Sequence, residues 1–100
     1  MPKPRKASLS KYKIFETEQF RSDIEKLPKK IRATIENKIR MYMYPQLGNE
    51  PNCGLNIKKL KNYSPPTWRY RIGNYRIFYE IDEEESLVSI LTIDLRKDAY

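Results

Sequence analysis

Three arginines around a Gly-Asn dipeptide are the residues of this sequence whose type and spacing point most directly to chemistry. Arg69 and Arg71 alternate with apolar residues before Gly73-Asn74, and Arg76 follows it in a second alternating run. A two-residue hairpin turn here places Arg71 opposite Arg76, with Arg69 on the same face. Like charges directly opposite each other destabilise a sheet. The pattern therefore predicts a site for an anion.

The predicted chemistry of this face is phosphate binding. A guanidinium offers a planar fork of donors that matches phosphate oxygens, but it stays protonated and is a poor general base. Lys58, Lys59 and Lys61 precede the hairpin and are expected to line the same groove. For any single arginine a solvated strand face is the ordinary interpretation, and for the lysines a generic basic patch. Several arginines on one face favour a functional site over a solvated surface.

The amino-acid composition excludes several classes of protein and of catalytic site. Lys and Arg number 20 and Asp and Glu 13, a net charge of +7 that predicts a polyanionic partner such as nucleic acid. The absence of histidine excludes histidine bases, Ser-His-Asp triads and histidine metal sites. The single cysteine, Cys53, excludes an intramolecular disulfide and fits a reducing cytoplasm. No apolar run approaches the ~20 residues of a membrane span.

The elements that must position these residues begin after a loose basic arm. Residues 1–10 are expected to be this flexible arm, and residues 11–100 a single domain. A strand at about 12–16 precedes a helix at about 18–26 capped by Thr17, and Pro28 suits the first turn of a second helix at about 28–43. An apolar stripe predicts the core faces of both helices: Phe20, Ile24, Leu27, Ile31, Ile35, Ile39 and Met43.

The second half of the chain predicts a loop at 45–56 and then antiparallel strands. The last strand, about 87–95, is expected to pair so that Arg76 faces Thr92, Phe78 faces Ile90 and Ile81 faces Leu87, although a four-residue loop before it would reverse its parity. Leu91 and Ile93 then join the core face, and Thr92 the arginine face. The fold class is α+β: an N-terminal strand and an antiparallel two-helix hairpin packed on a twisted antiparallel sheet of about four strands.

Three segments resemble one protein family. KKLKNY (58–63), WRYRIGNYRIFYEID (68–82) and LRKDAY (95–100), after a two-helix hairpin, are similar to the RelE/ParE superfamily of bacterial and archaeal toxins. The resemblance covers almost the whole chain from Lys11 onward. It implies the RelE-like fold and a type II toxin held silent by a cognate antitoxin.

The resemblance also implies roles for individual residues. Arg69 and Arg71 occupy positions where RelE-like toxins have lysine or arginine, and Arg76 matches an arginine that contacts the scissile phosphate. Arg96 matches a C-terminal arginine, and Tyr100 a C-terminal tyrosine that acts as a base or as a stacking surface. From spacing alone, Tyr100 is either one helical turn from Arg96, folded over the sheet edge, or part of a frayed terminus. Leu95 departs from the family, because many relatives have histidine there, and an arginine at 71 exchanges a proton less easily than a lysine.

The implied activity is metal-independent cleavage of messenger RNA in the ribosomal A site, without a cofactor, in the cytoplasm. The implied partners are the ribosome and its messenger RNA, and the implied RNA-binding or ribosome-binding residues are Lys58, Lys59, Lys61 and Arg69. A further implied partner is an acidic, RelB-like antitoxin that forms a heteromeric complex with the toxin; no membrane is involved. The alternative is a ParE-like toxin that inhibits DNA gyrase on the same scaffold without nuclease chemistry. A third interpretation is a plain basic nucleic-acid-binding module. It requires the similarity of the three segments to the family to be a coincidence.

Overall fold

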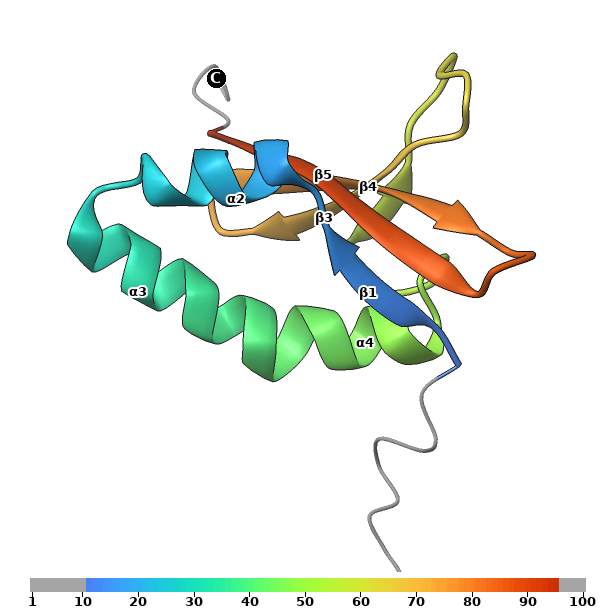
Figure 1. The fold of residues 1–100 in the computed structure, drawn as a ribbon, viewed down its shortest axis with the longest axis horizontal. Helices are drawn as coiled ribbons and strands as arrows, with labels where there is room; N and C mark the ends of the chain where they lie inside the picture. The colour runs from blue at the N-terminus through green and yellow to red at the C-terminus, as the bar shows by residue number, and fades with distance from the viewer. Residues whose placement is uncertain (1–10, 96–100) are drawn as a thin grey trace, which may run out of the picture.

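The sheet has five strands in the order β1-β5-β4-β3-β2 in the computed structural model, which describes residues 11–95 (Figure 1). The strands are β1 (Lys13–Glu16), β2 (Ile57–Lys59), β3 (Trp68–Ile72), β4 (Tyr75–Asp82) and β5 (Leu87–Leu95). The α+β class and the N-terminal strand are confirmed. The sheet is mixed rather than antiparallel throughout, because β1 lies parallel to β5, and β2 adds a strand to the expected four.

Two helices follow β1 as the sequence predicts. Helix α2 (Glu18–Glu25) begins at Thr17, whose hydroxyl oxygen accepts the N–H of Phe20 and whose O–H contacts the carbonyls of Ile90 and Leu91. That cap therefore also fixes the helix against β5. Helix α3 (Lys29–Lys38) begins after Pro28, which is the N-cap residue. None of the helices within residues 11–95 has the length and hydrophobicity of a membrane-spanning segment.

The predicted loop at 45–56 is wrong in its first residues. The helix continues through a π-helical turn, η1 (Ile39–Met43), into α4 (Tyr44–Asn49), with Pro45 in the first turn of α4. The Tyr44 N–H reaches back to the Ile39 carbonyl, and a wider turn suits a proline, whose ring crowds the preceding turn and donates no hydrogen bond. Met43 and Leu47, both 0% exposed, hold this extension in the core.

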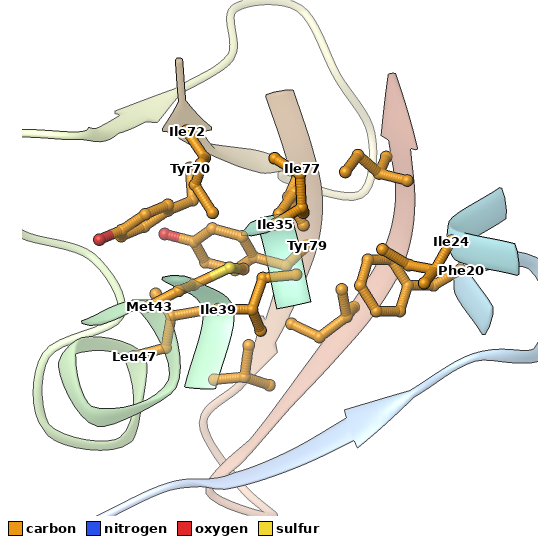
Figure 2. Close-up of a cluster of buried hydrophobic side chains, with 13 residues drawn as sticks. Phe20, Ile24, Ile35, Ile39, Met43, Leu47, Tyr70, Ile72, Ile77 and Tyr79 are labelled. Carbon is orange, nitrogen blue, oxygen red and sulfur yellow. The ribbon is translucent and has the colours of Figure 1, made fainter. Parts of the chain in front are cut away.

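One cluster of apolar side chains lies between the helices and one face of the sheet. Figure 2 shows residues of α2, α3, η1 and α4 meeting residues of β3 and β4. The predicted stripe is confirmed for Phe20, Ile24, Ile35, Ile39 and Met43. It is wrong for Ile31, which is 38% exposed, and Leu27 is only partly buried, because both lie near the turn between α2 and α3.

The central hairpin has the predicted register. Ile72 pairs with Tyr75, Arg71 with Arg76, and Arg69 with Phe78. Gly73 has a φ of 59°, as the first central residue of a type II′ turn requires, and this conformation favours glycine. The two arginines therefore lie opposite each other on the face that the helices leave open.

The predicted register between β4 and β5 is wrong. Asp82 pairs with Leu87 across a four-residue connection, so Tyr79 pairs with Ile90, and a bulge then makes Phe78 pair with Thr92 and Arg76 with Asp94. This arrangement buries Val88, Ile90 and Ile93 in place of the expected Leu91. The Thr92 hydroxyl donates to Asp23 of α2 and does not join the arginines.

Candidate functional site

A cationic groove lies on the open face of the sheet. Its volume is about 390 Å³. It is lined by basic side chains from three strands and one turn: Lys58, Lys59, Lys61, Arg69, Arg71 and Arg76, together with Leu60. The structure therefore brings together every predicted site residue that lies within residues 11–95. Arg96, Tyr100 and the basic arm of residues 1–10 lie outside the described residues.

Strand β2 carries the lysine wall of the groove. Lys58 pairs with Arg69 across the β2–β3 ladder, and the Lys59 ammonium lies 5.8 Å from the centre of the Trp68 ring. Arg69 donates from Nη1 to the Asn56 carbonyl at 3.3 Å, which anchors its guanidinium at this edge. Lys61 follows β2 in the connection to β3, which projects beyond the sheet in Figure 1. Strand pairing thus sets the spacing of the lysines and arginines.

A row of three charged residues crosses the sheet beside these lysines. Arg71, Arg76 and Asp94 are cross-strand neighbours on β3, β4 and β5. Arg76 Nη2 lies 3.2 Å from Asp94 Oδ2, with side chains 34% and 56% exposed. The sequence pattern predicts Thr92 opposite Arg76 and no carboxylate among the arginines. This prediction is wrong, because Asp94 occupies the position opposite Arg76. Asp94 offsets part of the repulsion between the two arginines.

The Arg76 guanidinium has one further contact, and one of its nitrogens lacks a hydrogen-bond partner among the described residues. Its Cζ lies 5.7 Å from the centre of the Phe78 ring, two residues along the same strand face. Its Nε is buried and has no hydrogen-bond partner among the described residues. An unsatisfied buried donor costs about 1–3 kcal/mol. The fold therefore holds this guanidinium in place at a local cost, as functional positions commonly do.

The groove can bind a phosphodiester and stabilise added negative charge on it. Six cationic side chains face a concave surface, where converging charges raise the local potential and attract anions. Guanidinium groups can bridge two phosphate oxygens, and lysine ammonium groups add mobile positive charge. In the part of the chain that the structure describes, no group of three or more Cys, Asp or Glu side chains is arranged to hold a metal ion.

Asp94 is the site residue that sequence reasoning missed. Residues 51–79 contain no Asp or Glu, so the carboxylate beside the arginines comes from a different part of the chain. Its signal in the sequence is a single acidic residue next to the last residue of β5. Reading that signal requires the β4–β5 register, which the bulge changes.

A family model covers most of the chain. The model described as the ParE toxin of the type II toxin–antitoxin system parDE matches residues 14–100. A curated relative, Toxin RelG of Mycobacterium tuberculosis, is 34% identical over 90 residues, which are 89% of this chain and 95% of the relative.

Solved structures of toxin–antitoxin complexes share the fold. The RelBE2 complex from Mycobacterium tuberculosis contains a chain with 32% sequence identity and a TM-score of 0.68, and the match covers 90% of this chain and 97% of that one. A RelB–RelE complex from Methanococcus jannaschii contains a chain with 30% identity and a TM-score of 0.60, and the match covers 86% and 94%. Both the sequence and the backbone are therefore similar to proteins of this group over nearly their whole length.

Proposed function

The chain belongs to the RelE/ParE superfamily of type II toxins, and on this premise we propose that it arrests translation by cutting messenger RNA in the ribosomal A site. The observation that carries the proposal is the groove lined by six lysines and arginines. Its curvature and charge suit a single RNA backbone. The proposed site of action places the protein in the cytoplasm.

The proposed reaction is attack of a ribose 2′-hydroxyl on its own 3′-phosphate. It needs in-line positioning, stabilisation of the charge that develops on phosphorus, and transfer of protons. Arg76, with Arg71 and Arg69 beside it, supplies the charge stabilisation, and Arg96 and Tyr100 extend the proposed site. A site without histidine lacks the most common acid–base catalyst, so it should be feeble on free RNA and depend on the ribosome to order its substrate.

The proposed regulator is an acidic antitoxin. The similar chains from Mycobacterium tuberculosis and Methanococcus jannaschii are toxins solved in complex with antitoxins. A net charge of +7 and an open arginine face favour a negatively charged segment that wraps this domain and covers the groove. The antitoxin would then inhibit the toxin by occupying the groove that RNA would enter.

Messenger RNA on programmed ribosomes tests the proposal. The protein should cut messenger RNA at the A-site codon within ribosomes and leave the same RNA almost intact without them, because only the ribosome orders the substrate. Primer extension on both samples measures this. Intact messages on ribosomes, in cells that nevertheless stop growing, would contradict it.

Inhibition of DNA gyrase is the second candidate function. The family model that matches residues 14–100 carries the ParE description, which favours this branch. It predicts DNA breaks and an SOS response after induction, with messages intact. Measuring both readouts in the same induced culture separates the two candidates.

Lys61→Ala should weaken binding to programmed ribosomes while leaving the cleavage rate at saturation unchanged. Lys61 is exposed, lines the groove and takes no part in the Arg76–Asp94 ion pair, so we assign it a phosphate contact. Losing one such contact should reduce the slope of log affinity against log salt by about 1. Lys38→Ala, on the exposed side of α3, is the control and should leave that slope unchanged. A Lys61→Ala defect that persists at high salt would contradict this role.

A further inference from the structure

A bulge in β5 places a carboxylate against Arg76, one of the arginines that line the cationic groove. Continuing the pairing of Tyr79 with Ile90 without the bulge would set Ile93 against Arg76. The extra residue, Leu91, shifts the strand, so that Ile93 pairs with Ile77 in the core and Asp94 lies against Arg76. Bulges next to active sites commonly re-aim a side chain in this way.

The Asp94 carboxylate is both anchored and accessible. Oδ2 lies 3.2 Å from Arg76 Nη2, while 56% of the side chain is exposed. An exposed ion pair of this kind contributes little to stability, typically about 0–1 kcal/mol. A carboxylate also reduces the positive potential of a groove that would bind anions. Asp94 offsets part of the repulsion between Arg71 and Arg76. The small stability that this adds leaves a chemical role as the better explanation of a carboxylate at this position.

None of the six cationic side chains that line the groove readily accepts a proton at neutral pH. Lysine and arginine side chains are protonated there and only donate, whereas an ionised carboxylate only accepts. On this basis, and resting on the proposed nuclease function, we propose that Asp94 is the general base that takes the proton of the attacking 2′-hydroxyl.

The geometry around Arg76 suits this role. A phosphate oxygen bound by its guanidinium would lie next to the carboxylate that the same group holds at 3.2 Å. In a near-attack arrangement the 2′ oxygen is about 3–3.5 Å from phosphorus. Both the base and the charge-stabilising arginine are then within reach of the reacting atoms.

The proton and electron movements balance without a further reactant. The 2′-hydroxyl proton passes to Asp94, the 2′ oxygen forms a bond to phosphorus, and the bond from phosphorus to the 5′ oxygen of the next nucleotide breaks. The leaving oxygen takes a proton from water, and Asp94 returns its proton to the hydroxide that remains. The products are a 2′,3′-cyclic phosphate and a 5′-hydroxyl.

Asp94→Asn tests the role, because the amide oxygen still accepts a hydrogen bond from Arg76 but is not a base. Single-turnover cleavage at saturating programmed ribosomes should fall about 10²–10⁴-fold, with the half-saturating ribosome concentration and the denaturation midpoint unchanged. Asp94→Glu, which keeps a carboxylate, should cleave at least about tenfold faster than Asp94→Asn. Glu80→Gln removes a charge from the other end of the same open sheet face and should cleave as the wild type does.

The outcomes separate this inference from the proposed function. If the wild type cuts no RNA on ribosomes, the proposed function itself fails. If the wild type cuts RNA and Asp94→Asn cuts it equally well or faster, Asp94 is not the base. The same conclusion follows if Asp94→Asn cuts at least as fast as Asp94→Glu. Fragments ending in a 3′-hydroxyl would also overturn the inference, because attack by the 2′ oxygen leaves a cyclic phosphate.

Discussion

Arg76→Ala should lower single-turnover cleavage on programmed ribosomes about 10²–10³-fold, the usual loss when one preorganised charge-stabilising donor is removed. The guanidinium lies at the groove, opposite Arg71 and bound to Asp94, so its removal takes away positive charge where the phosphate gains negative charge. The loss should appear in the rate at saturation rather than in ribosome binding alone.

The Arg76→Ala protein should still fold. The substitution relieves the like-charge pairing with Arg71 and removes a buried donor that has no partner among the described residues. Asp94 loses its ion pair, but its side chain is 56% exposed and water can solvate it. Arg32→Ala, a half-buried arginine of α3 away from the groove, is the matched control and should cleave normally. Undiminished toxicity of Arg76→Ala in cells would remove messenger RNA cleavage by this groove as the mechanism and give first place to gyrase inhibition.

Ile35→Ala should lower the free energy of unfolding by about 2–5 kcal/mol, the usual cost of truncating a buried isoleucine and leaving a cavity. Ile35 is 5% exposed and packs in the cluster of Figure 2. A protein of this size has only about 5–15 kcal/mol of stability, so the loss is a large share of it. Chemical denaturation followed by circular dichroism measures the shift in midpoint.

Ile31→Ala is the matched control, because it has the same residue type one helical turn earlier and belongs to the same predicted stripe. Its side chain is 38% exposed, so the loss should be about 1 kcal/mol or less. Equal shifts in midpoint for the two variants would contradict the position of α3 on the sheet.

Local sequence determined the central hairpin and hence half of the site. Side chains alternate across a strand because of covalent geometry, and a two-residue turn leaves no freedom in the register. The Gly73-Asn74 dipeptide therefore placed Arg71 against Arg76 without any information from the rest of the chain. The cap at Thr17 is local in the same sense, since a side chain and a backbone N–H three residues apart satisfy each other.

Packing between segments decided the features that the local sequence does not determine, namely the extent of the helix and the pairing of the outer strands. The helix continues past Pro45 because Met43 and Leu47 gain more by burial in the core than the proline costs at the first turn of α4. The parallel pairing of β1 with β5 joins residues far apart in the chain. The pairing of β2 with β3, which brings the lysines to the groove, spans the connection at residues 60–67.

The position of Asp94 shows this division most clearly. Alternation alone predicts that residues of β5 face opposite sides in turn, but it does not say which residue of β4 each one meets. That register depends on a four-residue connection and on a bulge that lets Val88, Ile90 and Ile93 all reach the core. The sequence by itself determined the arginines of the site, because their spacing is set within one hairpin. Only the tertiary structure decided that a carboxylate lies beside them, because burial of Val88, Ile90 and Ile93 sets the register of β5.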